Sequence, residues 1–310
     1  MSALADKKRL HWMGVMITFT GAVLFSTKAV LVKLAFREAD TDVITLLAIR
    51  MLFSLPFFLV AAWFATRERT EPLTLKQWLS VVGLGITGYY ISSWFDFVGL
   101  QYISAGLERL ILFLYPSFTA LINYFIFHQV LNKRQRWAMI LTYVGIGIAY
   151  MGELQIDAGN ENFFLGSFMV FICSITYAVY MAGSGRIIPK VGVTRFTAFA
   201  MLSATAGVFI HFLLANSTRE MHWSSGLWKF GLMVAILATV LPSFLISAGM
   251  KKIGANNVAI IGSIGPVSTI LQAYLFLGEE IHRGQIIGTC LVIAGVLLIG
   301  WKSGDGKKYE

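Results

Sequence analysis

Six ionisable residues lie within or at the rims of long apolar segments in the first half of the chain. They are Lys28, Lys33, Arg50, Asp96, Glu108 and Arg109. A charge near the centre of a bilayer costs a few kcal/mol or more, so such residues usually face a cavity or pair with one another. We expect Lys28, Arg50 and Asp96 to do so, and Arg50 to pair with Asp96 or bind a substrate carboxylate. Lys33 is expected to extend to the outer headgroups.

Aromatic residues accompany Asp96 on its segment. Tyr90, Trp94 and Phe97 recur at helical spacing and therefore share one face. Amphipathic rings on such a face suit a cavity for a small zwitterion, although ordinary helix packing gives the same pattern. The predicted cavity-lining residues are Tyr89, Tyr90, Trp94, Tyr177 and Tyr180.

Two prolines, Pro116 and Pro266, interrupt apolar segments at corresponding positions. Proline removes a backbone hydrogen bond and clashes with the preceding turn, so each is predicted to kink its helix. Gly262 and Gly265 weaken the second helix further. Broken helices at matching positions of two halves point to a transport site, and these four residues are the predicted hinges. Ordinary bending that shapes the bundle is the alternative.

The amino-acid composition indicates which secondary-structure elements position these residues. The chain is 57% hydrophobic and 13% charged, against about 25% charged residues in soluble domains. Its apolar runs are about 20 residues long and do not alternate, which favours membrane-spanning helices over a barrel. We predict an all-α membrane protein with ten transmembrane helices, over residues 12–35, 43–65, 78–100, 104–127, 137–153, 163–183, 195–215, 228–249, 256–277 and 284–301.

A weak internal repeat relates the two halves. Residues 99–145 match residues 249–295 without gaps, so that Pro116 falls on Pro266 and Gly145 on Gly295. Five helices in each half, an odd number, make the second copy enter from the opposite side as an inverted repeat.

Basic residues concentrate in alternate loops, which places both termini in the cytoplasm. The expected organisation is a cytoplasmic N-terminus (1–11), two five-helix repeats (12–153 and 163–302) and a cytoplasmic tail (303–310).

The chain resembles the ten-helix EamA branch of the drug/metabolite transporter superfamily, a branch of bacterial metabolite and amino-acid exporters. The resemblance covers nearly the whole chain. One departure occurs in the first copy, where His128-Gln129-Val130 stands in place of Gly-Glu. The residues that carry the match are Lys33, Ile49-Arg50, Pro266-Val267, the run Leu277-Gly278-Glu279-Glu280-Ile281, Gly288 and Ala294-Gly295-Val296.

This resemblance implies proton- or gradient-driven export of small metabolites without a cofactor. Small four-helix relatives couple protons through a carboxylate in their first helix, and this chain has none there. Asp96 or Glu108 is therefore the expected proton-coupling residue. A simple interfacial pair between Glu108 and Arg109 is the alternative.

We expect a secondary transporter that exports amino acids or similar small metabolites by alternating access, in the bacterial inner (plasma) membrane. The alternatives are an uptake permease for a small organic anion and a membrane-embedded enzyme. Neither a phosphate-binding loop, a His-Glu-x-x-His motif nor a serine elbow is present, so no catalytic residue is predicted.

The expected partners are a small-molecule substrate and the lipid bilayer, and the chain is expected to act as a monomer. The net charge of +9 lies in loops beside apolar runs, which indicates topology signals and anionic headgroups rather than nucleic acid. Cys173 and Cys290 lack metal-site spacing, so no metal is expected.

Overall fold

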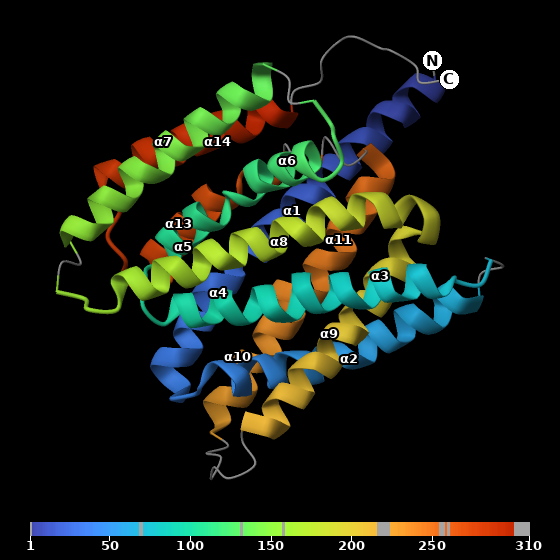
Figure 1. The fold of residues 1–310 in the computed structure, drawn as a ribbon, viewed down its shortest axis with the longest axis horizontal. Helices are drawn as coiled ribbons and strands as arrows, with labels where there is room; N and C mark the ends of the chain where they lie inside the picture. The colour runs from blue at the N-terminus through green and yellow to red at the C-terminus, as the bar shows by residue number, and fades with distance from the viewer. Residues whose placement is uncertain are drawn as a thin grey trace.

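All regular elements that the structure describes are helices, packed as a bundle (Figure 1). The structure is a computed structural model. It describes residues 2–67, 71–130, 133–156, 159–215, 224–253, 258 and 261–300. The predicted tail (303–310) and much of the start of the predicted helix 256–277 lie outside these described residues.

The first half of the chain contains long helices and shorter ones joined by irregular turns. Its third predicted helix is continuous but includes a π-helical segment, η1, and its fourth is divided into α5 and α6. The elements are α1 (Ser2–Ala39), α2 (Val43–Arg67), α3 (Leu75–Gly85), η1 (Ile86–Ile91), α4 (Ser92–Leu100), α5 (Ala105–Leu112), α6 (Tyr115–Phe125) and α7 (Lys133–Ile156).

The second half follows the same order. It again has a π-helical segment, η2, between two α-helices. The elements are α8 (Phe163–Val191), α9 (Val193–Ala215), α10 (Ser225–Ala235), η2 (Ile236–Val240), α11 (Leu241–Ile253), α13 (Gly265–Leu277) and α14 (Arg283–Gly300).

Seven helical spans among the described residues are long and apolar enough to cross a membrane. Such a length matches the hydrocarbon thickness of about 30 Å. Two shorter apolar helices lie at Gly265–Leu277 and Arg283–Leu298. The seven spans are Trp12–Ala39, Val43–Arg67, Ala105–Phe125, Gln135–Gln155, Phe163–Val191, Val193–Ala215 and Ser225–Ile246.

Irregular backbone features recur at corresponding positions of the two halves. The π-helical segments η1 and η2 begin at Ile86 and Ile236. Turns interrupt the helices at residues 113–114 and 263–264, immediately before α6 and α13. The repeated segments therefore share backbone conformation as well as weak sequence similarity.

Helices of the two halves pack against each other in antiparallel pairs. In the pair of α1 and α11, Gly14 lies against Ile253 and Gly21 against Leu245. In the pair of α8 with α3 and α4, Gly166 lies against Ile103 and Gly183 against Leu84. Glycine permits this close approach because it has no Cβ. Each half thus places its first helix against the third helix of the other half.

The last helices of the halves, α7 and α14, lie side by side at one edge of the bundle (Figure 1). Gly145 lies against the carbonyl of Gly288, and Gly288 against the carbonyl of Gly145. Small residues at such a crossing allow two membrane helices to approach closely.

This contact predicts unequal effects of two identical changes on α7. A Cβ added at Gly145 would lie 2.7 Å from the Gly288 oxygen, whereas one added at Gly147 would meet nothing within 4 Å. We expect Gly145→Ala to destabilise the protein by about 1–3 kcal/mol through overpacking. Gly147→Ala, the matched control, should be neutral or slightly stabilising. Thermal unfolding in nanodiscs checks this, and equal melting temperatures would contradict the packing described.

Candidate functional site

A buried ion pair lies at the centre of the candidate site. Lys28 Nζ of α1 lies 2.6 Å from Asp96 Oδ2 of α4, and the two side chains are 11% and 1% exposed. The structure therefore gives Asp96 a lysine from the first helix as its ion-pair partner. A buried pair of this kind offsets the cost of placing each charge in an apolar bundle.

A second acid and base reach the same region from α5. Glu108 is fully buried and interacts electrostatically with Asp96, Lys28 and Arg109. Its carboxyl group also shares a side-chain hydrogen bond with Asp96. The alternative of a solvated interfacial pair does not match this burial.

Arg109 extends from α5 toward α1. Its Nη2 donates to Ser26 Oγ at 3.5 Å, and its guanidinium lies 5.3 Å from the Phe25 ring centre and 5.5 Å from that of Phe113. Aromatic faces stabilise a cation in this way. Arg109 also lies against Gly265, where an added Cβ would be 2.9 Å from Nη2. The cluster therefore contacts the first turn of α13 in the other half.

Arg50 of α2 is buried beside this cluster but forms different contacts. Its Nη2 donates to Ser93 Oγ at 3.2 Å, and its guanidinium lies 5.3 Å from the Phe97 ring centre. Arg50 Nε has no hydrogen-bond partner among the described residues. Asp96 is ion-paired with Lys28 and not with Arg50, although Arg50 and Asp96 still interact electrostatically. Binding of a substrate group by Arg50 stays a prediction.

The structure divides the predicted aromatic residues into two groups. In the first group, Tyr89 and Tyr180 share a hydrogen bond of 2.9 Å between their hydroxyls. Tyr177 stacks on Tyr180 and meets Tyr115, with ring centres 5.7 and 5.0 Å apart. Tyr115 was missed in the sequence, although its position beside Pro116 offered a signal.

The second aromatic group faces α9 instead. The Tyr90 hydroxyl lies 2.9 Å from His211 Nδ1, and the Tyr90 ring lies against Gly207. The Trp94 ring centre is 6.0 Å from that of His211. The structure therefore separates Tyr90 and Trp94 from the tyrosines of α8.

The predicted hinge residues lie at the helix breaks. Pro116 and Pro266 each occupy the first turn of a new helix, where proline is tolerated because that N–H would lack an intrahelical partner. Gly265 contacts Arg109, and Gly262 has open space around it. Both breaks thus lie close to residues of the ionic cluster or its aromatic surround.

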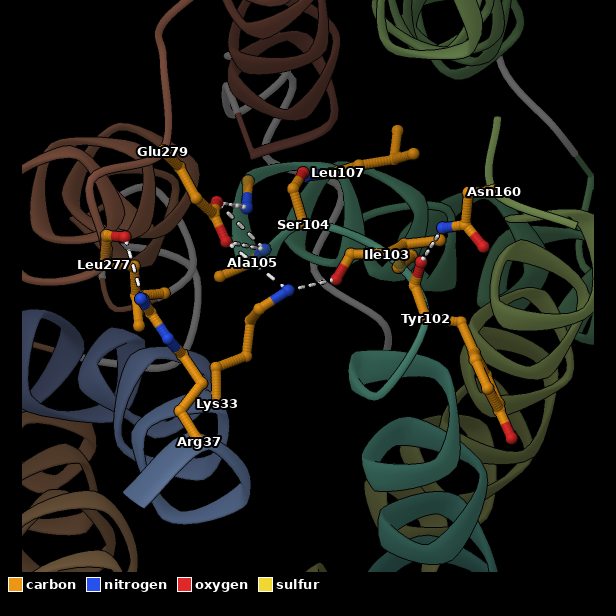
Figure 2. A network of polar contacts seen from close by, with 11 residues as sticks. Lys33, Arg37, Tyr102, Ile103, Ser104, Ala105, Leu107, Asn160, Leu277 and Glu279 are labelled. Carbon is orange, nitrogen blue, oxygen red and sulfur yellow. Dashed lines mark hydrogen bonds and ion pairs between the residues drawn. The ribbon is translucent and has the colours of Figure 1, made fainter. Parts of the chain in front are cut away.

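A further polar network lies at one end of the bundle (Figure 2). Lys33 Nζ donates to the Ile103 carbonyl at 2.6 Å and lies 3.5 Å from Glu279 Oε1. The expectation that Lys33 reaches lipid headgroups is therefore wrong, because a nearby carbonyl and carboxylate bind the ammonium. From the sequence, Glu279 is singled out only as part of the run 277–281. Its ion-pair partner, Lys33, lies far away in the sequence, so the pair could not be predicted from spacing.

Metal binding finds no support in the described part of the chain. No three His, Cys, Asp or Glu side chains gather there in a metal-binding arrangement. The chemistry of the cluster is that of ion pairing, hydrogen bonding and proton exchange.

Comparisons with known proteins agree with this architecture. The EamA-like transporter family matches residues 12–151 and 164–301. The chain is 26% identical over 280 residues to the uncharacterized transporter YcbK of Bacillus subtilis, covering 89% of this chain and 88% of that protein. It is 24% identical to the uncharacterized transporter sll1319 of Synechocystis, covering 94% of each. A crystal structure with 17% identity superposes with a TM-score of 0.64 over 92% of this chain, which indicates a shared fold.

A multi-pass helical bundle with a buried ionic cluster and two similar halves defines a membrane transporter. This chain belongs to the EamA-like transporter family, within the drug/metabolite transporter superfamily.

The Lys28–Asp96 pair predicts a pattern of stabilities. Removal of one partner leaves a buried charge uncompensated, which typically costs about 3–5 kcal/mol. We expect Lys28→Met and Asp96→Asn each to lower the thermal stability of the purified protein strongly. The double variant should be more stable than either single variant, because it removes both members of the pair and leaves neither charge uncompensated. Strictly additive losses in the double variant would contradict a direct pair.

Proposed function

We propose that this protein exports amino acids or similar small metabolites across the bacterial inner membrane by alternating access. Ten transmembrane helices, arranged as two inverted five-helix repeats, carry both termini on the cytoplasmic side. The protein acts without a cofactor, as a monomer in the bilayer. The buried cluster of Lys28, Asp96, Glu108 and Arg109 is the single observation that carries this proposal.

Burial of this cluster supports a transport site rather than a structural one. The Nε atoms of Arg50 and Arg109 lack a hydrogen-bond partner among the described residues. Buried polar groups are normally satisfied, and orphaned ones mark sites where a ligand or water belongs. Together with the neighbouring Arg50, the cluster has three bases and two acids, which leaves a positive excess. That excess favours a substrate with a carboxylate.

Polar aromatics extend this site. The hydroxyls of Tyr89, Tyr177 and Tyr180 offer hydrogen-bond partners around a small zwitterion, and their rings add no net charge to the path. Tyr90 and Trp94 instead contact His211 of α9. Substrate preference should therefore respond more to the first three residues.

Alternating access is supported by the antiparallel packing between the halves and by the matched helix breaks. If the two halves are inverted copies, a bend at one break on one side corresponds to a bend at the other break on the opposite side. Both breaks lie beside the ionic cluster. Movement at Pro116 or Pro266 would therefore change which side the cluster faces.

Proton coupling is assigned to Asp96 and Glu108. Two buried carboxyl groups that interact with each other disfavour simultaneous ionisation, so one of them readily holds a proton. Substrate binding beside Lys28 and Arg109 would alter that balance.

Counterflow in proteoliposomes tests the proposed function. We expect saturable exchange of at least one amino acid or small organic acid by the wild-type protein. Arg50→Gln should abolish this exchange, because the buried guanidinium can no longer bind a carboxylate. Arg67→Gln, the same change at the exposed end of α2, is the matched control and should transport normally. An Arg50→Gln variant with wild-type exchange would exclude the assigned role.

The helix breaks predict a kinetic defect. In Pro116→Ala and Pro266→Ala the ring that clashes with the preceding turn is absent, so the helix can continue through the break and local bending becomes harder. We expect each to slow turnover several-fold while apparent affinity changes less, because a conformational step is affected. Initial rates across a substrate concentration series measure both quantities. Unchanged turnover in both single variants and the double variant would mean that the prolines only shape the bundle.

A further inference from the structure

Glu279 links the two halves of the protein at one end of the bundle. It follows the end of α13, where Gly278 adopts a φ of 69° and the Glu279 N–H bonds to the Ala273 carbonyl at 3.3 Å. Arg37 Nη1 of α1 donates to the Leu277 carbonyl at 3.0 Å. The turn is therefore fixed from both sides, and it directs the carboxylate of Glu279 toward α5 (Figure 2).

The carboxylate of Glu279 occupies a built anion site. The Ala105 N–H lies 3.0 and 3.1 Å from its two oxygens, and the Gly106 N–H lies 3.4 Å from Oε2. Lys33 Nζ lies 3.5 Å from Oε1. The N-terminus of a helix carries partial positive charge and free N–H groups, so it binds anions well. Here the ammonium of Lys33 adds a full charge.

This site lies between open space and the buried start of α5. Two cavities, of 540 and 260 Å³, both border on Lys33, Gln101 and Glu279. Every residue of α5 is buried, and so are Lys28 and Asp96. Glu279 therefore borders the cavities and also contacts the first residue of the buried helix α5.

The corresponding turn of the first half differs in chemistry but not in backbone. His128 adopts a φ of 54°, and the Gln129 N–H bonds to the Asn123 carbonyl at 3.0 Å. These contacts repeat those of Gly278 and Glu279. Gln129 is exposed and neutral, so it cannot form an ion pair with a lysine. Only one of the two ends has a carboxylate at this turn.

We propose that Glu279 closes the outer mouth of the transport path by placing its carboxylate between Lys33 and the first amides of α5. A small free carboxylate occupies the same place when Glu279 is absent or displaced. The proposal rests on the transport function proposed above and names the gate of that site.

Thiol labelling tests this gate without any transport measurement. Ser26 lies two turns deeper than Lys33 on the same face of α1, roughly 10 Å along the helix axis. The reporter is Ser26→Cys in a Cys173→Ser, Cys290→Ser background, and a membrane-impermeant methanethiosulfonate is added to the outside of intact cells. We expect slow labelling in this parent.

Adding Glu279→Ala to the parent should raise the labelling rate about tenfold or more, since the coupling between sites in such equilibria commonly spans that range. Glu280→Ala, which removes the exposed neighbouring carboxylate, is the matched control and should leave the rate unchanged. If Glu279→Ala fails to reach the membrane, Lys33→Met serves as the second variant. It should open the gate by removing the cation that Glu279 binds.

Chemical rescue identifies the ligand class. Sodium acetate should slow labelling of the Glu279→Ala variant, because acetate fits the space left by the carboxylate, whereas equal sodium chloride should not. Unchanged labelling in Glu279→Ala and Lys33→Met, or an equal rise in Glu280→Ala, would overturn the gate. Equal effects of acetate and chloride would overturn the carboxylate site. Counterflow failure with a normal labelling pattern would instead count against the transported substrate class alone.

Discussion

The cost of holding charge inside an apolar helical bundle governs how this protein is arranged. Lys28 and Asp96 offset each other at 2.6 Å, and this joins α1 to α4 within the first half. Glu108 and Arg109 bring α5 to the same point, and Arg109 then reaches Gly265 at the start of α13. The ionic cluster is thus where the two halves meet at a helix break. A lone charge at this depth would be expensive, so the helices that supply partners must stay close.

The two halves share a backbone but not their chemistry. Matched π-helical segments, matched turns before the prolines and matched helix ends show how far the backbone similarity extends. The charges lie in the first half: where it has Asp96 and Glu108, the second half has Ile246 and Val258. At the turns after α13 and α6 the charge lies in the second half instead, because Glu279 occupies the position that corresponds to Gln129 of the first half. A duplicated scaffold therefore carries the buried ionic cluster on one copy and a carboxylate turn on the other.

Periodicity and composition predicted the helical class and the membrane setting because a bilayer restricts the backbone to few solutions. The repeat and the buried charges were also visible, since residue type alone reveals the cost of burying Lys28 or Asp96. The ion-pair partners of these charged residues were less predictable. Lys28 rather than Arg50 pairs with Asp96, and Lys33 binds Glu279, because side-chain pairing depends on helix rotation that sequence spacing does not specify. The π-helical segments were not foreseen, because no shared glycine or proline pattern marks them: η1 contains Gly88, whereas η2 contains neither residue type.

The central claim is that the buried cluster binds the transported solute rather than merely holding helices together. Substrate binding to the purified Lys28→Met, Asp96→Asn double variant is the sharpest test, because removing both members of the pair leaves neither charge uncompensated and the variant is expected to fold. Isothermal titration with a substrate identified by counterflow should give clear binding to the wild-type protein. The account predicts no measurable binding to the folded double variant. Wild-type affinity in a double variant of normal thermal stability would contradict it.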